Sequence, residues 1–596
     1  MKKFVPLLLL LLALSGAAGG RAAPAGAEFD ANAWPVVAAP VALDLAAPDS
    51  LDLAAPRDDD RPTHPRLDDA LAALAAQPDG KRSADAITAD GLRLRDGRVQ
   101  ARLVVAPGGD ETARAAVAAA GGEVTGALAD VLQVWLPPAE LTAVADSDGV
   151  AYLSAPDYAQ LAETDALSEG VARAQANAWH AAGLRGQGVR IAIIDGGFQG
   201  YTAKLGSELP ATVVVKNFVD GQPDAEVDAT TPHGTACAEI VHDMAPSAQL
   251  YLIKISTDVD LDQAVSYAIS QGVDVISTSL TFLNVTPGDG TGRFATMVER
   301  ARAAGILWAT AAGNYRETHW AGPWVDDGDG YHEYAPDVEV NVFGPGNGSA
   351  FQIPAGIVLS PALRWDDWAE VRQDFRLLLL RYNGTAFDVV ASANNPQTGL
   401  PGQRPTERLN FVTTGGPAIY GIAIQRISGA RPVFFHLTTP NRELDRRVPA
   451  MSLGDLADVP AALTVGAVGV NTPFAAESYS SEGPTNGPGG APTGGQLKPD
   501  IAAFAGVSTA SYGPRGFSGT SAATPHVAGA AALVSNRYPT FDPAALRFHL
   551  EEMAVDQGPA CADTRYGFGR LLLTLPGEPA GNRLLLPFLG RNSQRC

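Results

Sequence analysis

The sequence contains few cysteines, fewer basic than acidic residues, and one long apolar run at its start. Three cysteines in 596 residues exclude a disulfide-rich scaffold and a zinc site built from several cysteines. Lys and Arg total 43 against 65 Asp and Glu, so the net charge is -22 and nucleic acid is not an expected partner. Hydrophobic residues make up 46% of the chain, which excludes a wholly disordered protein. The length indicates roughly three or four domains.

The N-terminus has the features of a secretory signal peptide. Lys2 and Lys3 precede the apolar run Phe4–Leu14, and small residues follow it, so we expect a signal peptide over residues 1–18. No other stretch of 18 apolar residues exists. We therefore expect no membrane span after signal removal, and a secreted protein, either extracellular or at the cell surface.

Two segments follow before the main folded region. Residues 19–97 are rich in Ala, Pro and Asp, which predicts a mostly flexible segment with one helix near Leu67–Ala76. Residues 98–156 predict a small α+β domain. Its expected strands are Arg102–Val105, Val131–Leu136 and Val150–Leu153, and its expected helices are Glu111–Ala120 and Pro138–Ala145.

The remaining chain predicts an α/β fold that is interrupted once. In residues 165–316 and 453–576, buried-strand runs alternate with helical patterns, which indicates a doubly wound parallel sheet. The expected strands are Val189–Ile194, Leu250–Ile255, Val273–Leu280, Ile306–Ala311 and Leu463–Val470. The expected helices are Thr235–Asp243, Leu261–Gln271, Phe294–Ala304, Ser521–Ser535 and one that starts at Asp542-Pro543.

The interruption, residues 317–452, is rich in turn residues and short strand-like runs without a convincing helix. These runs are Val338–Phe343, Phe375–Leu380, Phe387–Ala391 and Ile419–Gln425. We therefore expect an inserted β-sandwich. Residues 577–596 form a C-terminal tail, for which an edge strand and a surface-attachment signal are both open.

Three reactive residues lie at boundaries between expected elements. Asp195 ends a buried strand, His233 precedes a helix, and Ser521 starts an apolar helix. Serine is a weak nucleophile that needs a neighbouring base, and histidine has a suitable pKa for that role. A buried carboxylate then holds the imidazole in the correct tautomer. These three residue types predict nucleophilic catalysis by Ser521.

A fourth residue supplies a donor for the negative charge that such a reaction develops. Asn314 follows the strand Ile306–Ala311 and has a side-chain amide that can donate to an oxyanion. The N–H of Ser521, at a helix N-terminus, can donate to the same oxygen.

The segments around these residues resemble the subtilisin family of serine peptidases. The order Asp195, His233, Ser521 is the family's order. The motif Gly-Thr-Ser-x-x-x-Pro at 519–525 is highly specific, and 311–314, Ala-Ala-Gly-Asn, matches the oxyanion-hole segment. The resemblance implies a secreted endopeptidase that acts on proteins or peptides, needs no cofactor, and binds its own propeptide in cis.

The resemblance also implies where the substrate binds. The implied substrate-binding residues are Ser279, Leu280, Thr281, Ala311, Ala312 and Gly313. Substrate would pair as an added strand with the backbone of 279–281. The family usually ends this segment with glycine where this chain has Thr281, so the shape of the pocket is open. Residues 98–156 would be the propeptide, with cleavage between Ser154 and Ser168.

Several alternatives stay open at this stage. The peptidase fold could be an inactive scaffold whose inserted sandwich binds protein or polysaccharide, or the insertion could gate access of substrate. Asp326, Asp327 and Asp329 could bind calcium, but turns use the same residues. We expect no metal site, and expect Cys237 and His526 to be packing residues. Whether Cys561 pairs with Cys596 is open.

Overall fold

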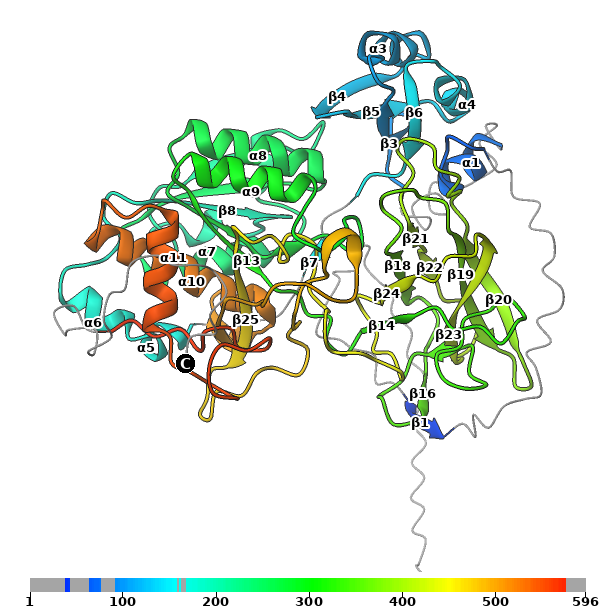
Figure 1. Ribbon diagram of the computed structural model, residues 1–596. Helices are drawn as coiled ribbons and strands as arrows, with labels where there is room; N and C mark the ends of the chain where they lie inside the picture. The colour runs from blue at the N-terminus through cyan, green and yellow to red at the C-terminus, as the bar shows by residue number, and fades with distance from the viewer. Residues whose placement is uncertain (1–37, 43–63, 77–91, 158–159, 162–167, 575–596) are drawn as a thin grey trace, which may run out of the picture. The chain divides into compact units, whose positions relative to one another are not determined.

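The computed structural model describes residues 38–42, 64–76, 92–157, 160–161 and 168–574 (Figure 1). The expected signal peptide, most of segment 19–97 and the tail 577–596 lie outside the described residues. Cys561 is disulfide-bonded, and Cys596 lies outside the described residues. Among the described helices, none combines the length and hydropathy that a membrane crossing requires.

The central element is a seven-stranded sheet in which every pairing is parallel. Its strands, in spatial order, are β26 (Ile501–Ala505), β25 (Leu463–Gly469), β13 (Leu307–Ala311), β11 (Val275–Thr278), β8 (Arg190–Asp195), β10 (Gln249–Lys254) and β9 (Val214–Asn217). The continuous apolar runs in the sequence correspond to strands that are buried on both faces.

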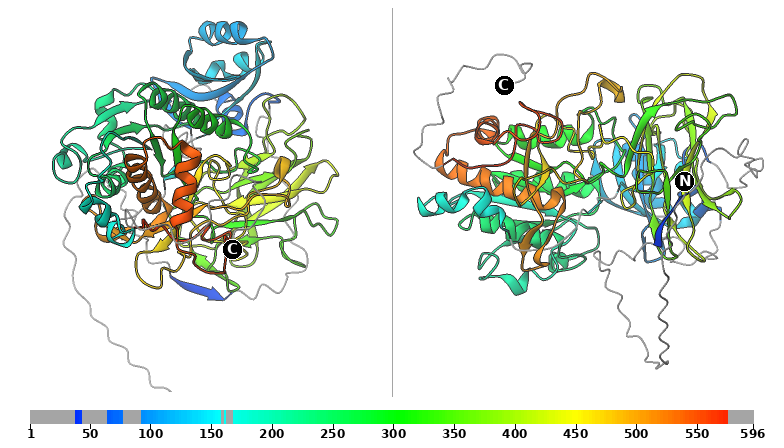
Figure 2. Two further views of the ribbon diagram at one scale, coloured as in Figure 1. Left: turned by 60° about the vertical axis from the view of Figure 1, so that its left-hand side comes forward. Right: turned by 90° about the horizontal axis from the view of Figure 1, so that it is seen from below.

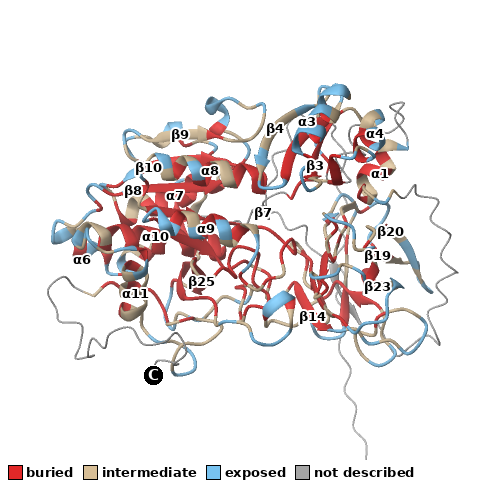
Figure 3. Cartoon of the chain, turned by 45° about the horizontal axis from the view of Figure 1, so that its top comes forward, coloured by how far each residue is buried: buried red, intermediate tan, exposed pale blue. Residues whose placement is uncertain are grey.

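Helices cover both faces of this sheet. One face packs against α7 (His233–Met244), α10 (Gly519–Arg537) and α11 (Pro543–Met553). The other face packs against α8 (Asp258–Ser270) and α9 (Arg293–Ala303). Figures 1 and 2 show the green helices α8 and α9 and the orange helices α10 and α11 on opposite sides of the strands. The predicted doubly wound parallel α/β fold is confirmed. Figure 3 shows α10 and α7 as largely buried.

Two strands of this sheet were not expected from the sequence. β9 has four residues, and β26 is Ile-Ala-Ala-Phe-Ala, whose alanines favour strands only weakly. β26 is fully buried and pairs with β25 along its whole length. Tertiary packing therefore decides its conformation.

The N-terminal domain contains an antiparallel sheet of five strands. They are β2 (Leu94–Arg95), β3 (Arg98–Val105), β4 (Glu123–Leu128), β5 (Val131–Leu136) and β6 (Val150–Ser154). Its helices are α3 (Asp110–Ala119) and, after the short 3-10 turn η1 (Pro138–Glu140), α4 (Leu141–Ala145). β4 was missing from the sequence-based prediction.

The helix expected near Leu67–Ala76 is present as α1 (Asp69–Ala75), but it is not part of a flexible segment. Leu71 and Leu74 lie in the hydrophobic core of the N-terminal domain. The Asp68 carboxylate accepts from the N–H of Leu71 at 2.8 Å and from the N–H of Ala155 at 2.5 Å, which ties α1 to the end of β6. The hydrophobic core of this domain therefore includes residues that precede position 98.

The structure describes all of residues 317–452, which contain two four-stranded antiparallel sheets and the shorter pair β17 (Val358–Leu359) and β22 (Phe411–Val412), with no α-helix. One sheet has the order β14 (His319–Pro323), β24 (Phe434–Thr438), β18 (Ala362–Trp365), β21 (Thr406–Arg408). The other has the order β15 (Asn341–Val342), β23 (Tyr420–Ser428), β19 (Asp374–Tyr382), β20 (Phe387–Ala393). Trp365 and Phe435 of the first sheet and Phe375 and Leu377 of the second share one hydrophobic core. We call residues 317–452 the inserted region.

Candidate functional site

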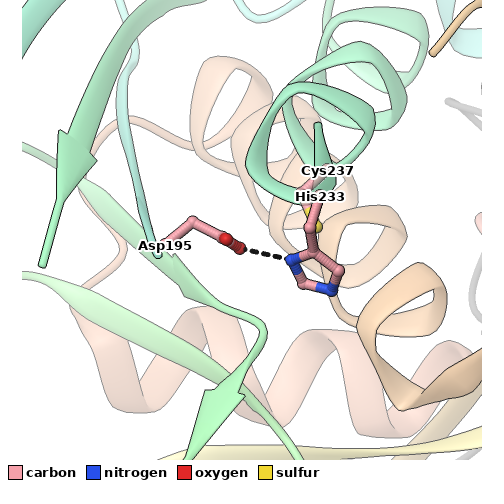
Figure 4. Close-up of side chains that lie close together, drawn as sticks. All are labelled: Asp195, His233 and Cys237. Atoms are coloured by element: carbon pink, nitrogen blue, oxygen red, sulfur yellow. Dashed lines mark hydrogen bonds and ion pairs between the residues drawn. The ribbon is translucent and has the colours of Figure 1, made fainter. Parts of the chain in front are cut away.

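Asp195 and His233 are brought together where β8 ends and α7 begins. Nδ1 of His233 lies 2.8 Å from Oδ2 of Asp195, and both side chains are fully buried. Oδ1 of Asp195 accepts from the N–H of Gly196 at 2.8 Å. Figure 4 shows the carboxylate pointing from the strand end toward the imidazole. A bond between Asp195 and Nδ1 fixes the ring orientation and directs Nε2 away from the carboxylate.

A glycine makes this close approach possible. A Cβ at Gly234 would lie 2.7 Å from Cβ of Asp195 and 2.5 Å from the carbonyl oxygen of Gly197. Both distances are shorter than van der Waals contact, so only glycine allows the first turn of α7 to lie against the end of β8. The Gly after His233 in the sequence motif therefore has a packing reason.

Ser521 lies in the first turn of α10, which packs along α7. The ring of Phe517, just before this helix, contacts the imidazole of His233 edge-on at 5.5 Å between centroids. The Sγ of Cys237, one turn after His233, lies 3.7 Å from the carbonyl oxygen of Ser521. Phe517 and Cys237 therefore connect the first turn of α10, which carries Ser521, with the first turns of α7, which carries His233.

The hydroxyl of Ser521 points to the predicted substrate-binding segment. Its Oγ donates to the carbonyl oxygen of Ser279 at 3.2 Å, and the hydroxyl of Ser279 donates to the carbonyl oxygen of Ser521 at 3.0 Å. A proton transfer from Ser521 to His233 therefore requires the hydroxyl to give up its hydrogen bond to Ser279 and direct its hydrogen to the imidazole.

Asn314 is oriented by a residue that sequence reasoning missed. The N–H and the hydroxyl of Thr520 donate to Oδ1 of Asn314 at 2.9 and 3.1 Å. The Thr520 hydroxyl also accepts from the N–H of Gly313 at 3.2 Å. Because a backbone N–H requires an oxygen acceptor, these contacts set the amide so that Nδ2 is the remaining donor. The sequence feature that could have identified Thr520 is its polar side chain directly before Ser521.

The segment Ser279–Thr281 already pairs with another strand. β12 (Leu280–Thr281) pairs antiparallel with β7 (Gln160–Leu161), with Leu280 opposite Leu161 and Thr281 opposite Gln160. β7 belongs to the connection between the N-terminal domain and the α/β domain, and it was not expected from the sequence. This edge of β12 therefore accepts an extended peptide strand.

Thr281 fills space beside this edge. Its side chain is buried, and its hydroxyl donates to the carbonyl oxygens of Phe282 at 3.1 Å and Asp455 at 3.3 Å. A Cβ at Gly454 would lie only 1.8 Å from Oγ1 of Thr281. The N–H of Gly454 donates to the carbonyl oxygen of Ala312 at 3.0 Å, so Gly454 connects Thr281 with the second predicted substrate-binding segment, residues 311–313.

Cys237 belongs to the same cluster. One ligand atom each of Asp195, His233 and Cys237 lie within 4.8 Å of one another. Burial, followed by the negative charge of Asp195, raises the pKa of the Cys237 thiol well above its usual range. A thiol must lose its proton to bind a metal, and here the imidazole and carboxylate are bonded to each other. This environment favours a packing role for Cys237.

Two further predicted residues or groups can be placed. His526 is fully buried, its Nδ1 lies 2.7 Å from the carbonyl oxygen of Ala522, and burial lowers its pKa to about 4, which agrees with a packing role.

Carboxylate oxygens of Asp326, Asp327 and Asp329 lie within 4.8 Å of one another. Oδ1 of Asp326 accepts from the N–H groups of Gly328 and Gly330 at 2.8 and 3.1 Å, which is a turn pattern.

Comparisons with known proteins agree with these sequence motifs. The model of the Subtilase family matches residues 186–353 and 386–569, more than half of the chain. Subtilisin E of Bacillus subtilis is 30% identical over 175 residues, which are 26% of this chain and 41% of that protein. Subtilisin of Bacillus pumilus is 30% identical over 162 residues, 24% of this chain and 54% of that protein.

Two further similarities are more distant. Alkaline elastase YaB of Bacillus sp. is 26% identical over 199 residues, 31% of this chain and 49% of that protein. The chain thus spans about half the length of the curated relatives that it matches. The structure of the Clostridium perfringens CspB protease has a TM-score of 0.48 and 14% identity, and the alignment covers 70% of this chain and 100% of that one.

Proposed function

Because the chain belongs to the subtilase family, we propose that it is a secreted serine endopeptidase that works through an acyl-enzyme intermediate. The observation that carries this proposal is the buried 2.8 Å contact between Nδ1 of His233 and Oδ2 of Asp195, next to the helix that starts at Ser521. Such a pair can accept a proton and stabilise the imidazolium that results.

The first chemical step forms the acyl-enzyme. Once its hydroxyl is released from Ser279, Ser521 gives its proton to Nε2 of His233 while Oγ attacks the scissile carbonyl carbon. Asn314 Nδ2 and the N–H of Ser521 donate to the oxyanion, and the latter is one of the first-turn N–H groups of α10, which have no partner within the helix. His233 then protonates the leaving amine.

The second step releases the acid product. Water enters in place of the amine, His233 takes its proton, and the hydroxide attacks the ester carbonyl carbon. Collapse of the second tetrahedral intermediate breaks the bond to Oγ, and His233 returns the proton to Ser521. This sequence uses only residues of the chain, so the proposed reaction needs no cofactor, and calcium is not required by any step.

The substrate is a protein or peptide bound as an extended strand on residues 279–281. The pairing of β7 with β12 supports this mode of binding. It also supports the N-terminal domain as a propeptide that occupies the substrate edge in cis. Since Leu161 lies opposite Leu280, and the preceding residue Ser279 contacts Ser521, we expect cleavage in the segment 162–168, shortly after β7. N-terminal sequencing of the processed enzyme tests this position.

A second candidate function comes from the inserted region. Its two sheets pack around their own hydrophobic core, and such a module could bind protein or polysaccharide while the α/β domain is an inert scaffold. A fluorophosphonate probe separates the two proposals because it forms a covalent bond only with an activated serine. Labelling of the processed chain that disappears in Ser521→Ala supports the peptidase. Absence of labelling in the processed wild-type chain supports the scaffold.

A further inference from the structure

Four arginine side chains from three parts of the chain surround the carboxylate of Asp157. Asp157 follows β6 and precedes β7, and its side chain is 4% exposed. Arg404 of the inserted region forms a bidentate pair, Nη1 to Oδ2 at 2.9 Å and Nη2 to Oδ1 at 3.2 Å. Nη2 of Arg293, at the start of α9, lies 2.6 Å from Oδ2. Arg408 and Arg102 approach to 3.8 and 3.9 Å.

The charges in this cluster keep Asp157 ionised. Burial alone would raise the pKa of Asp157, but Arg404, Arg293 and the two other arginines hold the pKa well below its usual range. Arg404 contributes from the inserted region, Arg293 from the α/β domain and Arg102 from the N-terminal domain. The carboxylate is the common partner of cations that would otherwise repel one another. We call these four arginines and Asp157 the clasp.

A second set of contacts joins the inserted region to the N-terminal domain. The N–H of Asp69, at the start of α1, donates to Oδ1 of Asn395 at 2.9 Å, and the N–H of Asn394 donates to the carboxylate of Asp69. Nε2 of Gln403 donates to the carbonyl oxygen of Pro65 at 3.4 Å. Residues 394–408 of the inserted region therefore contact both α1 and the end of β6, and we call them the receptor loop.

The receptor loop also packs tightly against the sheet of the N-terminal domain. A Cβ at Gly402 would lie 2.6 Å from Cβ of Tyr152 in β6, and the φ of Gly402 is +89°, a left-handed conformation that favours glycine. On the other side, the hydroxyl of Thr257 before α8 donates to Oε1 of Gln133 in β5 at 2.8 Å. The N-terminal domain is thus held by the α/β domain and by the inserted region.

We propose that the inserted region is a receptor for the N-terminal domain, and that the clasp keeps this domain bound after the chain is cut behind β7. The partner is the chain's own fragment, which carries Asp157 near its new C-terminus. Asp157 lies three residues before Gln160, so a bound Asp157 keeps β7 on the substrate edge. The regulatory consequence, a cut enzyme that stays inhibited, rests on the proposed function, whereas the binding itself does not.

The binding is measured in the Ser521→Ala chain, so that catalysis cannot affect it. Residues 162–167 are replaced by the recognition sequence of a site-specific protease, the purified chain is cut, and dissociation of the labelled N-terminal fragment is followed against excess unlabelled fragment. Removing one partner of a buried, hydrogen-bonded charge pair increases the dissociation rate by about 30-fold or more. We expect this increase for Arg404→Gln, and a smaller one for Arg404→Lys.

Arg431→Gln is the matched control, since Arg431 lies in the inserted region but pairs with Asp366 and Asp367 of that region. It is expected to leave the dissociation rate unchanged. Asp157→Asn, a change on the fragment side that leaves the receptor intact, is expected to increase the rate as Arg404→Gln does. Equal dissociation rates for wild type, Arg404→Gln and Asp157→Asn would overturn the proposal.

A parallel measurement in the chain with Ser521 intact follows hydrolysis of a short peptide after cutting. Faster onset of hydrolysis in Arg404→Gln than in Arg431→Gln supports both the clasp and its regulatory consequence. Accelerated dissociation in Arg404→Gln with no hydrolysis in any variant would refute the proposed peptidase function and still support the clasp.

Discussion

Thr281 gives a prediction about which substrates the enzyme prefers. Side chains alternate along a strand, so a substrate residue opposite Ser279 presents its side chain on the face that also carries Thr281. In the proposed reaction, that residue lies next to Ser521 and supplies the scissile carbonyl. Because Thr281 already packs against Gly454, little room is left there, and the wild-type enzyme should prefer a small residue such as alanine at this position.

The perturbation is Thr281→Gly, which removes Cβ, Oγ1 and Cγ2 from this space. One additional methylene that fits a hydrophobic pocket contributes about 1–3 kcal/mol, or about 10–200-fold in kcat/KM. The ratio of kcat/KM for a peptide with leucine at this position to one with alanine should therefore rise by about 10-fold or more. The rise should come from faster cleavage of the leucine peptide.

The assay uses two peptides that differ only at this residue, with Thr281→Ser as the control. Serine keeps the Oγ atom that bonds to the carbonyl oxygens of Phe282 and Asp455, so the control should retain the wild-type preference. An unchanged leucine-to-alanine ratio in Thr281→Gly, with activity preserved on the alanine peptide, would refute the assignment of Thr281 to the pocket.

Three other predictions address the framework of the site. Arg364→Met removes the cation that lies 2.9 Å from the buried Asp455. In urea titrations of the Ser521→Ala chain, this change should lower the free energy of unfolding by about 3–5 kcal/mol. A loss below about 1 kcal/mol would contradict this prediction. Thr520→Val removes one hydrogen bond to Asn314 and should reduce kcat about fivefold with KM unchanged, and a change in KM alone would contradict it. Dialysis against a chelator, which would empty any site at Asp326, Asp327 and Asp329, should leave kcat/KM unchanged; recovery of lost activity with calcium would disprove this.

The sequence could predict β8, β10, β11, β13 and β25 of the central sheet because their residues form continuous apolar runs, as in strands buried on both faces. Continuous apolar runs such as Val189–Ile194, when helical patterns separate them, indicate strands of a parallel sheet that is covered on both faces. The same property places Asp195 at the end of a strand and His233 at the start of a helix, where the structure puts them. Local signals were sufficient for these elements.

Other parts depend on contacts between residues far apart in the chain. β7 has two residues and exists through its pairing with β12, more than 100 positions away. α1 was expected as a helix, but its attachment to the N-terminal domain depends on Asp68 and Ala155. The clasp around Asp157 combines residues from three regions of the chain. No local pattern in the sequence encodes such partners.

The central claim is that Asp195, His233 and Ser521 act as one catalytic unit, and comparing single and double variants tests it most directly. Steady-state kcat/KM on one peptide is measured for His233→Ala, Ser521→Ala and the double variant. Residues that work in a single proton-transfer unit are strongly non-additive, so the double variant should be no slower than the slower single variant. Losses that multiply in the double variant, or a His233→Ala enzyme with wild-type kcat/KM, would contradict the account.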